Sequence, residues 1–500
     1  MMKKIFSVLL AGVCLQVNAQ NHEDIFRYSN QQVVGSVRTM GLSGAWGAAG
    51  ADLSSASYNP AGIGLYRRNE WMGSMAFTVN RSSTDFNGNP MVDNRTMFNI
   101  PNFGMVFNST TPSNGAQKAQ GVIGGSLALG MNRINDFQSN IAFSGTVKNS
   151  SVGDYLARMA YGTDTSAMWG ADYDNTLFAL ARRVNLIYND TAGNQFGSWQ
   201  RISNDTDYTM FQYQQLQSRG RMNEWYVTGG LNISNFLYLG GSLVIDHAVY
   251  THDNNYSETL KKSSVAGNKY KSSLVNQHVE TRGTGVGGKF GMILRPADFI
   301  RLGASYHTPI RMNMRDDYYN SVTMNFTDGT SYTEPLEKRI DYYEYQIITP
   351  SRFTSSASII VGKILILNAD YERIDFTKGR LQSKDVMTDF MDANNVNKQV
   401  FAVAQNYKVG MEVCGRYTRY RAGYALLGSP YNSAVLSAAD GNKHLLSIGF
   451  GWVYDDAYFF DIAVNDRIGK DFLTPYDGSP VTVTNETHKL NFSFGMGCRF

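Results

Sequence analysis

The chain contains few of the residues on which several protein classes depend. Only 3 of its 500 residues are cysteine, and the two beyond the leader, Cys414 and Cys498, fall on opposite faces by strand parity, so we expect no disulfide and no metal site. Charged residues amount to 17% and the formal net charge is +3, which provides no basic surface for nucleic acid. No segment beyond the leader has the long apolar run of a transmembrane helix. The sequence therefore excludes a disulfide scaffold, a nucleic-acid-binding protein and a helical membrane protein.

The first residues have the pattern of an export signal. Two lysines precede an apolar run over residues 5–13, and Val17 and Ala19 occupy the −3 and −1 positions of a cleavage site before Gln20. This run is too short to cross a membrane as a helix. We expect residues 1–19 to be a cleaved signal peptide, so the mature chain is either a soluble secreted protein or a β-barrel.

Aromatic residues and glycine are abundant, with 30 Tyr, 27 Phe and 48 Gly. From Leu490 to Phe500, apolar side chains alternate without a break with polar or very small ones. Successive side chains of a strand point to opposite faces, so this segment has one apolar face and one polar face. The mean hydropathy of −0.30 is natural for a barrel, because its strands face lipid on one side only.

The same alternation recurs along most of the chain. It covers fourteen segments, near residues 71–81, 96–108, 119–131, 222–234, 236–251, 273–294, 299–314, 338–361, 363–374, 400–415, 418–426, 443–454, 457–466 and 487–500. Tight turns alternate with long polar connections between them, as the short periplasmic turns and long external loops of outer-membrane barrels do. We therefore predict an all-β fold, a 14-stranded antiparallel transmembrane β-barrel over residues 71–500 with both termini in the periplasm.

Two regions do not have the pattern of barrel wall. Residues 20–70 are rich in Gly, Ala and Ser, and we predict that they fill the wide lumen as an N-terminal hatch. Residues 132–221 are predicted to be a long extracellular loop with short helices, because apolar residues recur there at helical spacing. These helices either pack on each other and on neighbouring loops or line an external groove for an apolar ligand. The candidate groove residues are Tyr155, Leu156, Met159, Leu177, Leu180 and Val184.

The residues that could support catalysis do not converge. Ser305 and His307 share one strand face but are two residues apart, too far for the hydrogen bond that a Ser/His/Asp set with Asp246 would need. We therefore predict that the protein is not an enzyme. Charges of both signs fall on the lumen face, and we expect most of them to pair with one another and with the hatch. A smaller role is to bind the carboxylate of a ligand, and the candidates for this are Arg301, Arg419 and Arg421.

At residues 40–67, MGLSGAWGAAGADLSSASYNPAGIGLYR, the chain resembles the FadL/TodX (OmpP1) family of outer-membrane transporters for hydrophobic compounds. The centre, Asn59-Pro60-Ala61 followed by Gly62, matches the NPA motif of the family's hatch. Residues 301–309, 349–353, 367–376 and 421–431 resemble its later strands. In length and loops the chain resembles the Bacteroidetes-type members that are often labelled hemin receptors.

This resemblance implies a passive path with no cofactor. The hatch closes the barrel, an external groove captures an apolar ligand, and the hatch shifts to let the ligand pass. A kink in one wall strand can open a lateral gap toward the bilayer. The expected partners are a hydrophobic small molecule, outer-membrane lipids and the barrel-assembly machinery, and the protein is expected to be a monomer.

Three functions remain open from the sequence. The first is a channel for hydrophobic molecules such as long-chain fatty acids, gated by the hatch. The second is a surface adhesin or structural barrel that binds a partner through its long external loops, and the third is a nonspecific porin, which the hatch argues against. Fatty acid, aromatic hydrocarbon and heme-like ligands all fit the sequence, as do lateral and periplasmic exit.

Overall fold

The computed structural model describes residues 22–110, 120–170, 173–189, 196–203, 205–335, 337–338, 340–362, 364–384 and 390–500. The predicted signal peptide, residues 1–19, lies outside the described residues. No helix in this described part combines the length and the apolar character that a membrane-crossing helix needs.

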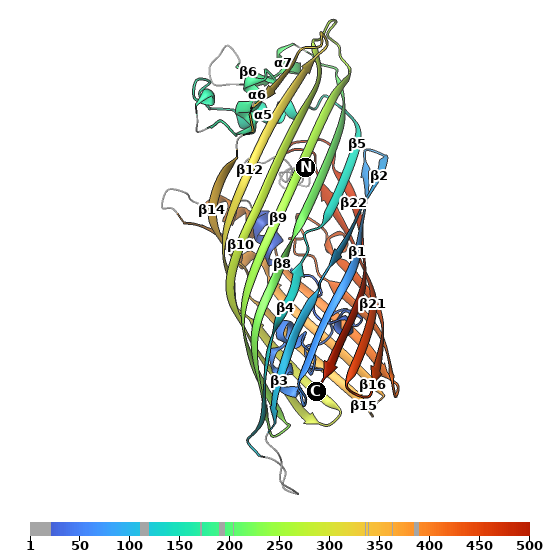
Figure 1. Cartoon of the computed structure of the whole chain (residues 1–500). Coiled ribbons are helices and arrows are strands. Elements are labelled where there is room, and N and C mark those ends of the chain that lie inside the picture. The colour runs from blue at the N-terminus through green and yellow to red at the C-terminus, as the bar shows by residue number, and fades with distance from the viewer. Residues whose placement is uncertain are drawn as a thin grey trace.

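The strands form one closed antiparallel barrel of 14 wall strands, as the alternation predicted (Figure 1). Ten wall strands are continuous: β1 (Glu70–Phe86), β8 (Thr209–Ile233), β9 (Leu237–Lys262), β10 (Tyr270–Ala297), β16 (Leu365–Asp375), β18 (Val403–Cys414), β19 (Thr418–Leu427), β20 (Lys443–Tyr454), β21 (Tyr458–Leu473) and β22 (Val483–Arg499). Four are interrupted: β2 (Asn89–Asn99) with β3 (Asn102–Thr110), β4 (Val122–Asn135) with β5 (Ser139–Lys148), β11 (Ile300–His307) with β12 (Arg311–Phe326), and β14 (Asp341–Ile348) with β15 (Arg352–Val361). The barrel closes where β22 pairs with β1, from Glu70 opposite Arg499 to Asp85 opposite Thr484.

The remaining elements are short. Inside the barrel lie α2 (His22–Ser29), α3 (Val37–Met40), α4 (Ser55–Tyr58) and the 3-10 helix η1 (Pro60–Leu65). The longest connection contains α5 (Val152–Met159), η2 (Ala167–Trp169), α6 (Leu177–Arg183), β6 (Ile187–Asn189), β7 (Phe196–Ser198) and α7 (Trp199–Ile202). Other connections contain β13 (Ser331–Glu334), η4 (Phe376–Lys378), β17 (Arg380–Ser383), α8 (Met391–Val400) and α9 (Ala438–Gly441).

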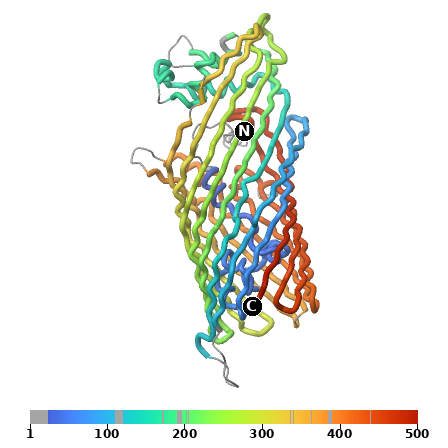
Figure 2. The backbone as a smooth tube through the Cα atoms, viewed as in Figure 1, coloured from blue at the N-terminus to red at the C-terminus, as the bar shows by residue number. Residues whose placement is uncertain are grey.

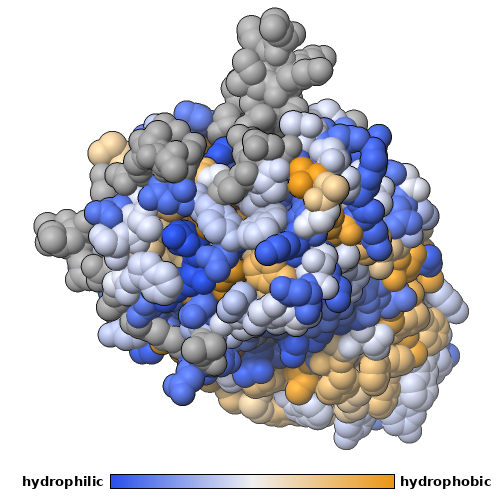
Figure 3. Space-filling view, turned by 90° about the horizontal axis from the view of Figure 1, so that it is seen from above, coloured by the Kyte–Doolittle hydropathy of each residue, from blue (hydrophilic) through white to orange (hydrophobic). Residues whose placement is uncertain are grey.

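The two faces of the wall differ as the alternation requires. On β22, Phe492, Phe494 and Met496 are 38%, 41% and 46% exposed on the outside, whereas Asn491 and Ser493 face the lumen and are buried. We call the end of the barrel that carries α5, α6 and α7 the loop end and the opposite end the turn end (Figure 1). Figure 3 looks down on the loop end, where hydrophilic residues gather, while hydrophobic residues lie on the side of the barrel. The outer side of the wall is therefore the apolar one.

Several wall strands are longer than the alternation predicted. The segment predicted at 236–251 continues as β9 to Lys262. The alternation did not reveal this extension, because one face of its last residues is polar and the other mixes polar residues with Tyr256 and Leu260. β5 and the first half of β8 also lie inside the connection predicted at 132–221; β5 does alternate, with Ile141, Phe143 and Val147 on one face, and the sequence analysis missed it. In the structure this connection spans only residues 149–208.

The described N-terminal residues up to the end of η1, 22–66, lie inside the barrel, and we call them the plug (Figure 2). Its residues from Thr39 to Ala49 are all buried. The large apolar side chains of the plug, such as Ile25, Leu53 and Ile63, join one cluster with lumen-facing residues of the wall, such as Val244 and Met312. The plug and the wall therefore share a core.

Candidate functional site

The Asn59-Pro60 motif begins a helix and ties the plug to the wall. Asn59 caps η1, because its Oδ1 accepts a hydrogen bond from the backbone N of Ala61 at 3.2 Å. Pro60 occupies the first helical position, where a missing N–H costs nothing. The Asn59 Nδ2 donates to the carbonyl of Gly47 in the plug at 2.7 Å and to that of Met292 on β10 at 3.2 Å. One side chain thus caps the helix and joins two layers.

Eight wall glycines lie at close approaches between the wall and the plug. A Cβ added to any of these glycines would come into contact with atoms of plug residues 37–64. Such close approach of two backbones is a recurrent reason for glycine in a strand. The glycines come from eight wall strands and are Gly230, Gly240, Gly291, Gly303, Gly410, Gly423, Gly449 and Gly495. The plug is therefore fitted against most of the circumference.

Ion pairs connect the plug to the wall and the wall strands to one another. Arg38 of the plug lies 2.5 Å from Glu412 on β18, which also pairs with Arg421 on β19 at 2.6 Å. Arg421 in turn lies 2.5 Å from Asp461 on β21. The expected pairing of lumen charges with each other and with the plug is confirmed for these four residues, and it satisfies charges that would be costly to bury alone.

The three candidate carboxylate-binding arginines do not form one site. Arg301 on β11 donates to the carbonyl of Ala49 in the plug. Arg419 donates to the carbonyls of Gly415 and Thr418 at the β18–β19 turn. Arg301 is separated from Arg419 and Arg421 by the intervening strands β15, β16 and β18. Their role toward a ligand stays a prediction.

Ser305 and His307, which the sequence places on one strand face, both meet the plug. The Ser305 hydroxyl donates to the carbonyl of Tyr58 at 2.8 Å, and the His307 Nε2 lies 3.2 Å from the same oxygen. Their contacts in the structure are those of residues that hold the plug in place.

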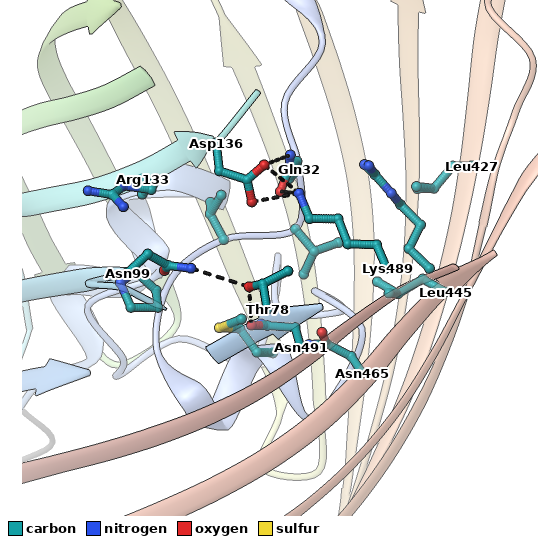
Figure 4. A pocket seen from close by; sticks show the side chains of 15 residues that line it. Gln32, Thr78, Asn99, Arg133, Asp136, Leu427, Leu445, Asn465, Lys489 and Asn491 are labelled. Atoms are coloured by element: carbon teal, nitrogen blue, oxygen red, sulfur yellow. Dashed lines mark hydrogen bonds and ion pairs between the residues drawn. The ribbon is translucent and has the colours of Figure 1, made fainter. Parts of the chain in front are cut away.

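A chamber of about 60 Å³, lined by both polar and apolar side chains, lies between the plug and the wall (Figure 4). Lys489 on β22 pairs with Asp136 at 2.5 Å, and both side chains are less than one-tenth exposed. Gln32 of the plug donates to Asp136 at 3.2 Å and to Asn135 at 2.7 Å. The backbone N of Gln32 also donates to the carbonyl of Ile134 at 2.9 Å. The plug is therefore pinned to the end of β4.

The chamber extends to the β2–β3 break and to the β4–β5 break. In the described part of the chain, the backbone hydrogen bonds of the wall are missing between β2 and β5. The chamber is lined by Asn99 and Pro101 at the β2–β3 break and by Asp136 at the β4–β5 break. Among the described residues, β2 has a backbone ladder only with β1, and β5 only with β8. The wall strand that contains β2 is joined to the next one only below the breaks, from Asn102 onward through β3 and β4.

Side chains replace the missing ladder. Asn80 and Thr84 of β1 donate to the carbonyls of Gln138 and Ala142, at 2.9 and 2.7 Å. Asn89 of β2 donates to the carbonyl of Ser144 at 2.7 Å. Because these bonds run from side chain to backbone, the β1–β2 hairpin overlaps β5 and is not joined to it edge to edge.

The predicted external-groove residues lie in a packed cluster. Leu156, Leu177, Leu180 and Val184 are fully buried and Tyr155 is nearly so, while Met159 packs against them partly exposed. The cluster includes residues of β8, β9, β10 and β12, such as Tyr256 and Val322. This arrangement matches the alternative in which the helices pack on each other and on their neighbours. The predicted helices themselves are present as α5 and α6.

The sequence analysis missed Gln32, Asp136 and Lys489. Lys489 lies 353 residues from Asp136 along the chain, and each residue is an ordinary polar residue in its own segment. The strand parity of β22 does place Lys489 on the lumen face with Asn491 and Ser493. A lone lysine on that face was the signal that could have drawn attention to it.

Comparison with solved structures shows which known proteins share this fold. No protein-family model matches the chain, and no curated protein matches it at a significant level. A FadL homologue from Pseudomonas aeruginosa has a similar structure, with a TM-score of 0.57 over 94% of this chain and 100% of its own, at 12% identity. The toluene transporter TodX from Pseudomonas putida has a TM-score of 0.51 over 94% of this chain and 100% of its own, at 11% identity. The chain has the FadL fold. At these identities the likeness concerns the fold alone, and the FadL fold here covers both the plug and the wall.

Proposed function

We propose that the protein is a passive outer-membrane channel for hydrophobic molecules such as long-chain fatty acids, gated by the plug acting as a hatch. The observation that carries this proposal is the chamber, because it connects the plug segment around Gln32 to the discontinuity between β2 and β5. A ligand that displaces this segment enters the chamber and leaves sideways between the two strands. No wall ladder has to break on this route.

The exposed belt outside the barrel supports a bilayer location. Large apolar residues such as Trp71, Phe290 and Tyr420 are 40–59% exposed around the barrel, a surface that water would solvate poorly. We also propose that the protein is a monomer, that the barrel-assembly machinery inserts it, and that it uses no cofactor. The neighbours named above, a FadL homologue and a toluene transporter, agree with a hydrophobic cargo.

The second candidate function is an adhesin or structural barrel. The observation that favours it is the height of β8, β9 and β10, which have 25, 26 and 28 residues where a membrane crossing needs about 9–11. Their outer halves rise above the wall toward α5 and α6 (Figure 1). Removing the helical connection without affecting uptake, but with loss of adhesion, would favour this function.

A cleavable crosslink across the discontinuity tests the channel. In a background with Cys414→Ser and Cys498→Ser, the pair Arg95→Cys and Gln138→Cys joins β2 to the residue directly before β5, since the two native side chains meet at 2.5 Å. We expect the crosslinked protein to lose uptake of a labelled fatty acid and to regain it after cleavage of the linker.

A matched pair controls for the chemistry. Asn313→Cys with Gln346→Cys links β12 to β14, which are already joined by a ladder, and the native side chains meet at 2.8 Å. Crosslinking this pair should leave uptake unchanged. Uptake that survives the first crosslink would exclude the lateral route, and absence of uptake by the parent protein would contradict the channel itself.

A further inference from the structure

The outer face of the barrel has an apolar groove of about 460 Å³ across β3, β4, β8 and β9. Phe103 and Met105 line one side of it, Trp225 and Leu243 the other, and Leu129 stands between them. These five side chains are all 39–57% exposed. Among the residues that the structure describes, no charged side chain lines the groove. Its volume falls within the range of small-molecule sites, and it opens on the same face as the rest of the exposed apolar belt.

The wall is thin beneath the groove. Gly104 on β3 pairs with Gly130 on β4, and both face the lumen, so two neighbouring inner positions carry no side chain. On the lumen side the ring of Tyr226 covers both, since a Cβ on either glycine would contact its hydroxyl. Tyr226 is 3% exposed, and its hydroxyl has no hydrogen-bond partner within the described part of the chain. An apolar ring therefore closes the floor from inside.

One end of the groove is fixed by aromatic packing. The rings of Phe103 and Trp225 pack edge to face with centroids 5.6 Å apart, and Met131 is buried between their strands. Phe103 lies two residues after Pro101, which marks the β2–β3 break. The groove thus begins directly below the discontinuity in the wall.

We propose that this groove binds one acyl chain of a bilayer lipid. An alkyl chain is flexible and has no polar atoms, as the lining requires, and the groove is continuous with the surface that faces the acyl chains. A void on this face would forfeit the contacts that packed side chains make elsewhere, and a seated chain restores them. The inference rests on the proposed membrane location and not on transport.

Photolabelling of the purified protein in bilayers tests the site. The probe is a phospholipid with a diazirine on one acyl chain, and the crosslinked peptides are quantified by mass spectrometry. We expect a severalfold excess of label on residues 103–107 and 225–227 over the exposed apolar face of β20, whose Ile448 is 64% exposed. Leu129→Phe fills the groove and should remove the excess.

Two further variants make the result decisive. Leu129→Ala widens the groove and should keep the excess, and Ile448→Phe makes an apolar enlargement elsewhere on the outer face and should leave the labelling of the groove unchanged. Even labelling around the barrel, or an excess that persists in Leu129→Phe, would overturn the proposal. Uptake of labelled fatty acid by the same variants is a separate readout, so failure of the channel proposal would be seen independently of lipid binding.

Discussion

The fit between the plug and the wall can be tested with one methyl group. Gly240 on β9 faces the backbone of Pro60 and Ala61, and a Cβ there would overlap these atoms. Because both sides are backbone, neither can move away without shifting η1 or β9. Overpacking of this kind costs about 1–3 kcal/mol. Since each ~1.4 kcal/mol is a factor of ten, Gly240→Ala should shift the balance from the seated to the displaced plug by roughly 5- to 150-fold.

Gly241→Ala is the matched control for this change. Gly241 is the next residue on the same strand and points outward, where the nearest atoms to an added Cβ are 3.9 Å away, an ordinary contact distance. Open probability in planar bilayers should therefore rise in Gly240→Ala and stay at the parent level in Gly241→Ala. Equal behaviour of the two variants, with both folded as judged by heat-modifiable migration on gels, would refute the idea that the plug must fit against the wall.

Three further changes probe the plug. Asp136→Asn leaves Lys489 buried without its counter-charge, at a cost of about 3–5 kcal/mol, and should increase bilayer conductance. The control Asp466→Asn removes an exposed pair with His488 and should not change the conductance. Asn59→Ala removes the cap of η1, worth about 0.5–2 kcal/mol, and should speed hydrogen exchange at residues 61–65; unchanged exchange would contradict the capping role. Deletion of residues 35–57 should leave the wall folded and open a hydrophilic leak in conductance measurements, and a deletion that conducts no more than the parent would show that this segment does not close the lumen.

The fold could be predicted from the alternation of apolar and polar residues, because each wall strand has one apolar outer face. Where strands extend beyond that belt, as in the outer half of β9, the outward face is polar and the lumen face mixes polar residues with Tyr256 and Leu260, so the alternation of apolar and polar residues is lost. The same parity places Gly240 on the lumen side, between Tyr238 and Ser242. Parity cannot reveal that Pro60 lies opposite Gly240, because this contact joins segments 180 residues apart, as 240 − 60 shows. The inner face was therefore readable from the sequence, whereas the partners across the lumen were not.

Some interruptions of the wall strands can also be predicted from the sequence, and one cannot. Three of the four breaks contain a proline: Pro101, Pro309 and Pro350. Proline cannot donate to a ladder, so these three positions are marked in the sequence. The break between β4 and β5, at residues 136–138, contains neither proline nor glycine.

At this fourth break, the backbone of Phe137 adopts φ of 50°, a left-handed conformation that costs a bulky residue about 1–3 kcal/mol. The surroundings that offset this cost come largely from the plug. The Phe137 ring packs edge to face against Tyr28 of α2 and Tyr250 of β9, at 5.6 and 5.4 Å, while Gln32 holds the adjacent Asp136. The bend that carries β5 behind the β1–β2 hairpin is thus stabilised by plug residues far away in the sequence. We therefore expect the plug and the discontinuity in the wall to be energetically coupled: departure of the segment from Tyr28 to Gln32 would remove the support of the strained Phe137 and would free β5 to change its path.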